Sequence, residues 1–118
     1  MLIDCRINYI ELPANDLSKA KQFYGEVFGW TFEDYGEDYC AFNDGYLDGG
    51  FYPSALKSKS AANGAALVIL YADDLESTMD RITKAGGEIC TPTFSFPGGR
   101  RFHFHDPCGN ELAVWSDQ

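Results

Sequence analysis

The stretch "INYIELPANDLSKAKQFYGEVFGWTF", residues 7–32, joins a strand pattern directly to a helix pattern. Its second part carries apolar residues at three- and four-residue steps, which predicts a helix with one buried face. The members of this stripe are Leu17, Ala20, Phe23, Tyr24 and Val27. Asn15 or Asp16 can cap the start of the helix, and Gly29 can end it. The residues before the cap predict a strand over about 3–12 that runs straight into this helix.

The same junction occurs a second time in the chain. Shifting the first half by 58 residues places "ANDL" (14–17) over "ADDL" (72–75). A strand is predicted over about 65–72, followed by a helix in "DDLESTMDRITKAGG". Asp73 and Glu76 resemble a capping box, and Gly86-Gly87 can stop the helix. The buried stripe of this helix is Leu75, Met79, Ile82 and Ala85.

Three short strands follow each helix. Glycine, "NDG", "PGG" and "DPCGN" supply the turns between them. The predicted strands are about 30–35, 38–43 and 46–52 in the first half, and 87–96, 99–105 and 111–116 in the second. The order strand-helix-strand-strand-strand is therefore written twice, which indicates an internal duplication. We predict an α+β fold of two βαβββ modules, about 1–52 and 65–118, in a single domain of residues 1–118. Residues 53–64 are expected to form a linker or mobile loop.

Composition limits the classes of function. The 118 residues include 9 Lys and Arg against 18 Asp and Glu, a formal net charge of −9. This balance argues against nucleic acid as a partner and can attract cationic small molecules. No apolar run approaches the roughly 20 residues needed to cross a bilayer, and the first residues do not resemble a secretion signal. We expect a cytoplasmic protein with no membrane partner.

The four cysteines, Cys5, Cys40, Cys90 and Cys108, are widely spaced and form no C-x-x-C motif. Reduced, buried thiols are therefore expected, and structural zinc is disfavoured because tetrahedral sites usually present ligands in close pairs.

Both histidines lie in "FHFHDPCGNELAVW", residues 102–115, which predicts a hairpin with "DPCGN" at its tip. Pairing His105 with Glu111 sets Phe104 opposite Leu112, His103 opposite Ala113, Phe102 opposite Val114 and Arg101 opposite Trp115. Opposed residues share a face, so Phe102, Phe104, Leu112 and Val114 form an apolar face against a helix. The other face is mixed polar and aromatic. Near the hairpin mouth, His105 and Glu111 are expected close to solvent as an ion pair.

The chain resembles the vicinal oxygen chelate superfamily in two motifs. The first is "FYGEVFGW" after an Asp-Leu helix start, and the second is "FHDPCGN" in the last hairpin. That group includes glyoxalase I, bleomycin- and fosfomycin-resistance proteins, methylmalonyl-CoA epimerase and extradiol dioxygenases. The resemblance covers both modules. It implies that each sheet curls into a cup whose concave face forms a pocket, with the helices on the convex faces. It also implies a homodimer, with pockets often made partly by both chains.

The resemblance implies four metal-ligand positions, from the first and last strand of each module. Here these positions hold Tyr9, Leu67, Ala113 and, in the fourth strand, a residue near Gly49, Gly50 or Phe51, with Asp48 the nearest candidate ligand. Leucine and alanine cannot bind a divalent ion. No cofactor is therefore predicted, and a divalent metal is disfavoured. The alternative is a displaced metal site of His103, His105 and Glu111.

Strand alternation places Cys5, Ile7, Tyr9 and Glu11 on the concave face of the first strand, and Leu67, Ile69 and Tyr71 on that of the fifth. This predicts an aromatic cleft for a small organic ligand, flat or cationic. Its predicted ligand-binding residues are Tyr9, Glu11, Ile69, Tyr71, Arg101, His103 and Trp115. His103 is the best candidate for a catalytic residue. The aromatic residues of this set are equally suited to a dimer interface.

Three functions are compatible with these patterns, and whether the chain is an enzyme is left open. The first, which we favour, is a metal-free protein that sequesters a small molecule, similar to bleomycin-resistance proteins. The second is a glyoxalase-like lyase, isomerase or dioxygenase that uses a displaced site around His103, His105 and Glu111. The third is a structural or regulatory module that acts through protein contacts.

Overall fold

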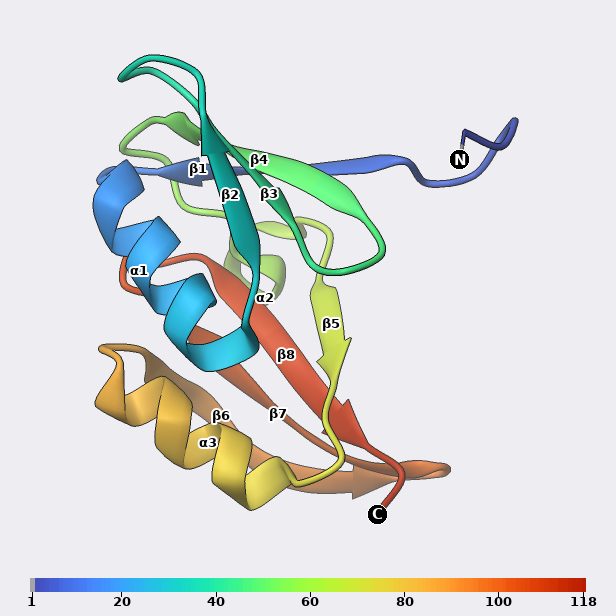
Figure 1. Ribbon diagram of the computed structural model, residues 1–118. Coiled ribbons are helices and arrows are strands. Elements are labelled where there is room, and N and C mark those ends of the chain that lie inside the picture. Colours follow the sequence, from blue (N-terminus) through green and yellow to red (C-terminus); the bar gives the residue numbers. More distant parts are fainter. Residues whose placement is uncertain (1) are drawn as a thin grey trace.

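The computed structural model describes residues 2–118 as eight strands and three helices (Figure 1). The elements are β1 (Tyr9–Ala14), α1 (Leu17–Phe28), β2 (Thr31–Asp34), β3 (Cys40–Asn43), β4 (Asp48–Pro53), α2 (Ser60–Asn63), β5 (Val68–Tyr71), α3 (Leu75–Lys84), β6 (Glu88–Phe96), β7 (Gly99–His105) and β8 (Glu111–Ser116). No helix within this described part is both long and apolar enough to cross a membrane.

The strands form two mixed sheets of identical topology. Sheet A has the order β1-β4-β3-β2, and sheet B has the order β5-β8-β7-β6. In each sheet the first and last strands of the half pair in parallel, and the other pairs are antiparallel. The predicted α+β fold of two βαβββ halves is therefore confirmed.

The two main helices lie next to each other on one side of the molecule (Figure 1). Asp16 caps α1 by accepting a hydrogen bond from the Lys19 amide at 3.1 Å, and Gly29 ends the helix in the left-handed conformation, φ 72°. Both features match the sequence prediction. The cap of α3 does not: Asp74, not Asp73, accepts from the Ser77 amide. Glu76 instead pairs with Arg100 on β7.

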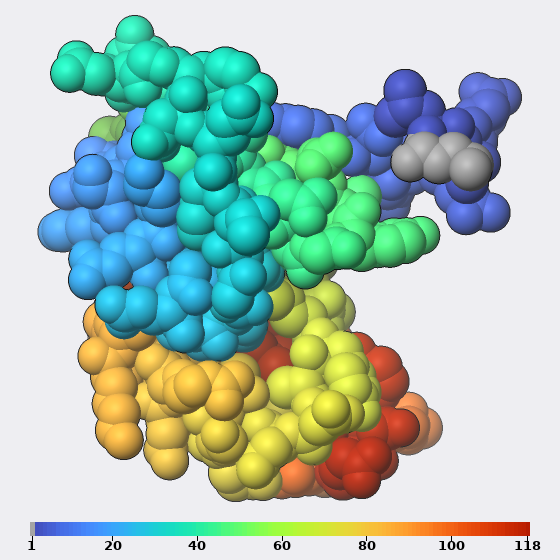
Figure 2. Space-filling view, viewed as in Figure 1, coloured from blue at the N-terminus to red at the C-terminus, as the bar shows by residue number. Residues whose placement is uncertain are grey.

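Three further boundaries differ from the prediction. The first strand begins at Tyr9, because residues 3–6 form a turn in which Cys5 has φ 66°. Cys5 and Ile7 are consequently exposed in an N-terminal arm that projects from the body and are not on a strand face (Figure 2). The fifth strand begins at Val68, so Leu67 precedes it. The linker contains the short helix α2, which the sequence pattern did not predict.

One apolar core joins the two halves. The hairpin pairs with the predicted register, His105 opposite Glu111 through Arg101 opposite Trp115. Its apolar face, Phe102, Phe104, Leu112 and Val114, is fully buried. The ring of Phe104 lies 6.0 Å from both Phe23 and Phe28 of α1, so the helix of the first half packs on the sheet of the second. The predicted helix stripes line this core, with Leu17, Met79 and Ala85 partly buried.

The turn between β7 and β8 holds the halves together. Asp106 accepts hydrogen bonds from the amides of Cys108 and Asn110 and from the Tyr24 hydroxyl of α1, the last at 2.8 Å. Burial raises the pKa of this carboxyl, and these donors partly oppose the rise. Asn110 is 0% exposed and donates to the carbonyl of Pro13 at the end of β1, 2.7 Å away. The "DPCGN" sequence is thus a joint between the halves as well as a hairpin turn.

The cysteines are all free thiols, of which Cys40 and Cys108 are buried and Cys90 is half-buried. The expectation of burial is wrong for Cys5, because the N-terminal arm contacts little of the core.

Candidate functional site

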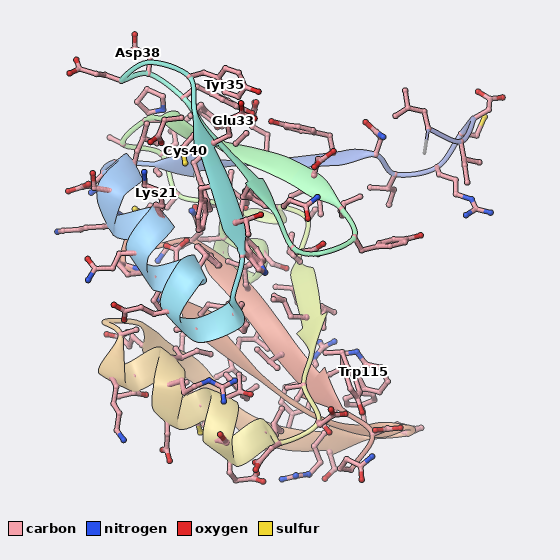
Figure 3. The ribbon with its side chains drawn as sticks, in the orientation of Figure 1. Lys21, Glu33, Tyr35, Asp38, Cys40 and Trp115 are labelled. Atoms are coloured by element: carbon pink, nitrogen blue, oxygen red, sulfur yellow. The ribbon has the colours of Figure 1, made fainter. Side chains whose placement is uncertain are left out.

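The face of sheet B that points away from α3 carries most of the predicted site. Strand alternation sends every second side chain of β7 and β8 to this face, and Figure 3 shows Trp115 on it. A hollow of about 280 Å³ is lined by Ile69, Phe96, Arg101 and Trp115. The Tyr71 ring lies edge-on to Trp115, with 5.1 Å between centroids. Five of the seven predicted ligand-binding residues therefore share this face: Ile69, Tyr71, Arg101, His103 and Trp115.

His103 forms a buried pair with Glu111 on this face. Its Nδ1 lies 2.9 Å from Oε2 of Glu111, and the two side chains are only 12% and 4% exposed. The other oxygen of Glu111 accepts from the backbone amide of Ala61 at 3.0 Å. The His103 hydrogen bond, followed by that of Ala61, lowers the pKa of the Glu111 carboxyl. Glu111 is therefore an ionised acceptor, and Nδ1 of His103 donates its proton to the hydrogen bond between them.

This arrangement corrects the predicted ion pair. Glu111 does not lie near solvent with His105, because the linker crosses the hairpin mouth and covers it: Ser58 accepts from the Glu111 amide at 2.7 Å. His105 lies 3.7 Å from the exposed Glu88 of β6 instead. Of the alternative metal site of His103, His105 and Glu111, only His103 and Glu111 therefore lie together.

Arg101 places its guanidinium against two aromatic rings. The guanidinium carbon lies 5.2 Å from the centre of the Phe94 ring and 5.9 Å from that of Phe96. Its Nε is buried and has no hydrogen-bond partner, and the same is true of Nε2 of His103. Two polar atoms without partners therefore face the same side of β7, two residues apart.

The remaining predicted residues, Tyr9 and Glu11, lie on sheet A. Their side chains meet at Tyr39, whose hydroxyl is hydrogen-bonded to the Tyr9 hydroxyl and to Glu11. Burial, with these two bonds, raises the pKa of Tyr39 well above its ordinary value. Gly50 makes room for this cluster, since a Cβ there would overlap the Tyr39 phenol. Tyr39 fell within the predicted strand 38–43 but carries no motif, so the sequence did not single it out; in the structure it immediately precedes β3.

The paired strands identify the fourth family ligand position. Glu11 of β1 and Ile69 of β5 are equivalent under the 58-residue shift. Ile69 lies opposite Ala113, and Glu11 lies opposite Gly50, so Gly50 is the position in the first half that corresponds to Ala113. The four positions therefore hold Tyr9, Gly50, Leu67 and Ala113. Only the tyrosine carries a donor atom, and its hydroxyl is already bonded to Tyr39. These residues do not fit the divalent metal of the family.

The displaced position does not supply a metal site either. Across residues 2–118, no group of three His, Cys, Asp or Glu side chains converges closely enough to hold a metal ion. His103 and Glu111 use their facing atoms on each other.

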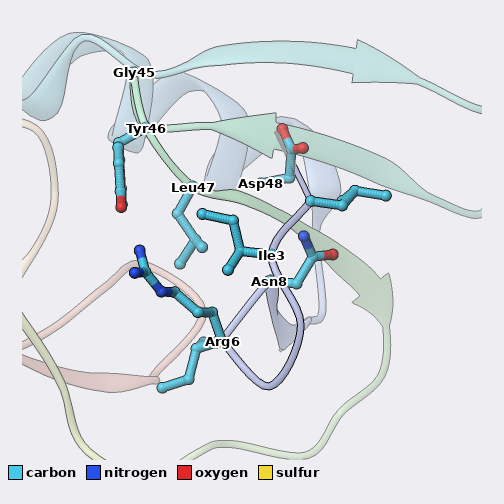
Figure 4. A pocket seen from close by; sticks show the side chains of 9 residues that line it. Ile3, Arg6, Asn8, Gly45, Tyr46, Leu47 and Asp48 are labelled. Atoms are coloured by element: carbon cyan, nitrogen blue, oxygen red, sulfur yellow. The ribbon is translucent and has the colours of Figure 1, made fainter.

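The predicted site thus falls into two groups, one on each sheet. Within the described chain no hydrogen bond, ion pair or aromatic contact connects Tyr9 or Glu11 to the sheet B group. A hollow of about 400 Å³ lies between the halves, beneath the turn at Asp44 and Leu47 and beside β5, and shares Ile69 and Tyr71 with the sheet B group (Figure 2). Another, of about 330 Å³, lies between the N-terminal arm and the β3–β4 turn and contains none of the predicted residues (Figure 4).

The fold and these motifs define a glyoxalase-like protein. The chain belongs to the Glyoxalase/Bleomycin resistance protein/Dioxygenase superfamily, whose sequence profile matches residues 6–114. It is 30% identical over 125 residues to a glyoxylase-like domain-containing protein of Didymella fabae, covering 97% of this chain and 95% of that one.

Other relatives are more distant. The chain is 26% identical over 123 residues to CFP32 of Mycobacterium tuberculosis, whose name includes the word glyoxylase; this match covers 92% of the chain but only 44% of the relative's length. Among solved structures, the fosfomycin resistance protein FosX of Listeria monocytogenes aligns with a TM-score of 0.79 at 16% identity, covering 97% of this chain and 94% of that one. A glyoxalase/bleomycin resistance protein/dioxygenase family enzyme of Burkholderia phytofirmans gives 0.77 at 14% identity, covering 94% and 98%. These structural likenesses support the fold.

Proposed function

We propose that this chain is a metal-independent small-molecule-binding member of the superfamily, similar in action to ligand-sequestering resistance proteins. The observation that carries the proposal is the state of the four family ligand positions. Three hold glycine, leucine or alanine, which offer no side-chain donor atom, and the tyrosine at the fourth is hydrogen-bonded to Tyr39. The face of sheet B that carries Ala113 instead presents an aromatic hollow that includes Arg101, whose buried Nε has no hydrogen-bond partner.

The test combines metal analysis with ligand screening. Protein purified without a histidine tag is expected to contain no stoichiometric Zn, Ni, Mn or Fe. A library of aromatic acids, amines and neutral compounds should contain members that raise the melting temperature, because a ligand that binds only the folded state stabilises it. A stoichiometric metal that is lost in His103→Ala would refute the metal-independent proposal.

A second candidate is metal-free acid-base catalysis by His103. Glu111 orients the ring through Nδ1, which leaves the buried, unpartnered Nε2 as the atom that would take up a proton in general base catalysis. Turnover of a bound carbonyl compound that disappears in His103→Gln, while binding persists, would favour this candidate over sequestration.

We also propose a homodimer in which the two groups of site residues meet across the subunits. Tyr9, Ile69 and Tyr71 are large, yet 43%, 43% and 47% exposed. Such exposed aromatic and aliphatic area is typical of interfaces. Light scattering should give twice the chain mass, and a monomer mass at micromolar concentration would contradict this proposal. A cytoplasmic location is part of the same proposal, since all four thiols are free.

A further inference from the structure

Two adjacent arginines of β7 have opposite environments. Arg100 points to the helix side and forms two hydrogen bonds to the carboxylate of Glu76, at 2.8 and 3.3 Å. Arg101 points to the hollow and has no acidic partner within residues 2–118, although the chain carries 18 acidic residues. An arginine charge that is partly removed from water and left without a counter-ion is costly. The fold therefore retains a cation where none of its many carboxylates neutralises it.

The surroundings of Arg101 position its guanidinium for an incoming group. Phe94 and Phe96 hold the guanidinium from their ring faces, which limits its freedom without satisfying its N–H groups. A guanidinium presents parallel N–H groups that match the two oxygens of a carboxylate. The rest of the hollow, Ile69, Phe96 and Trp115, is apolar or aromatic and suits a flat ring.

We propose that the ligand of this hollow is a small aromatic carboxylic acid whose carboxylate binds Arg101 and whose ring lies against Trp115. This inference rests on the proposed small-molecule-binding function and adds the charge of the ligand.

The test uses three probes that share a naphthalene ring and differ in charge: 2-naphthoate, 2-naphthamide and 2-naphthylmethylammonium. Calorimetric titration of the full chain at pH 7.5 should show the carboxylate binding most tightly. Arg101→Gln should weaken its binding at least tenfold and leave the affinity for the amide unchanged. Arg101→Lys, which keeps the charge but loses the paired N–H geometry, should give an intermediate affinity.

Arg100→Gln is the matched control. Like Arg101→Gln, it brings the net charge from −9 to −10. Arg100 lies on the same strand but on the opposite face, so its replacement should leave naphthoate affinity unchanged. Equal losses in the two variants would mean that general electrostatics, not Arg101, attracts the acid, and would overturn the inference. Circular dichroism melts confirm that each variant is folded.

The remaining outcomes separate this inference from the function beneath it. If the ammonium or amide probe binds more tightly than naphthoate, small-molecule binding stands and the anionic ligand is refuted. If none of the three probes binds the wild-type chain, the inference of an aromatic acid ligand fails, and the proposed small-molecule binding is decided separately by the library screen described above. If Arg101→Gln changes the mass measured by light scattering, the cation pairs with a carboxylate of a second copy, which also overturns the inference.

Discussion

Replacement of Asn110 by alanine should be among the most damaging single changes in this chain. The Asn110 side chain is fully buried and makes three hydrogen bonds across three segments. Its Nδ2 donates to the Pro13 carbonyl at 2.7 Å and to the Asp106 carboxylate at 3.1 Å, and its Oδ1 accepts from the Ser58 amide at 2.8 Å. These bonds connect the end of β1, the linker and the hairpin turn.

The magnitude follows from what Asn110→Ala leaves behind. The Pro13 carbonyl and the Ser58 amide lose the partner that Asn110 supplied, and each such group costs about 1–3 kcal/mol when it stays buried. Together with the weaker contact to Asp106, the free energy of unfolding should fall by about 3–5 kcal/mol. Domains of this kind are stable by about 5–15 kcal/mol, so the variant should melt roughly 10–20 °C lower.

Urea denaturation followed by circular dichroism measures this change, with Asn8→Ala in the exposed N-terminal arm as the control. The control should stay within about 0.5 kcal/mol of the wild type. Asn110→Asp supplies a second check, because the new carboxylate faces that of Asp106. Its destabilisation should therefore be larger at pH 7 than at pH 4. A loss below about 1 kcal/mol in Asn110→Ala would refute the view that this side chain joins the halves.

Three further predictions concern single side chains. Because the pKa of Glu111 is lowered in the folded state, its carboxylate adds stability above about pH 4.3, the ordinary pKa of glutamate. This contribution is lost as the pH falls through the pKa of Glu111 in the folded state. Glu111→Gln should therefore be less stable at pH 7 and show a shallower acid decline in urea titrations; parallel curves would contradict the pairing. Tyr24→Phe removes a hydrogen bond to the buried Asp106 carboxylate and should cost about 1.5–3 kcal/mol at pH 7, and less at pH 3.5, where that carboxyl takes up a proton. Gly49→Ala places a Cβ against the backbone carbonyl of Ile10, which cannot move aside, and should cost about 2 kcal/mol or more in a thermal melt; a neutral effect would show that β1 and β4 are less closely packed.

Much of the fold could be predicted because its rules are local. Helix periodicity and the residues Asp16 and Gly29 located α1 to within a residue or two, since cap and stripe depend on neighbours three and four positions away. The register of the last hairpin followed from the turn "DPCGN" and strand alternation. The N-terminal strand was placed too early because the turn at Cys5 has no such local signal.

The site was predictable only as a set of residues sharing a face. Alternation along β7 and β8 placed Arg101, His103 and Trp115 together, and the structure agrees. The partners of those side chains come from distant segments: Ala61 of the linker for Glu111, and Phe94 of β6 for Arg101. Such partners depend on how the chain closes over the sheet.

By itself, the sequence determined the duplicated order of elements, the apolar face of the hairpin and the loss of donor atoms at Leu67 and Ala113. Each of these depends on residue type and on spacing along the chain. Only the tertiary structure decided that Glu111 is buried with His103 and that Arg101 has no counter-ion although Arg100 has one. The physical reason is that burial and ion pairing are set by what packs against a residue from elsewhere in the chain. The linker covers Glu111, α3 supplies Glu76 to Arg100, and no acidic side chain reaches Arg101 within the described residues.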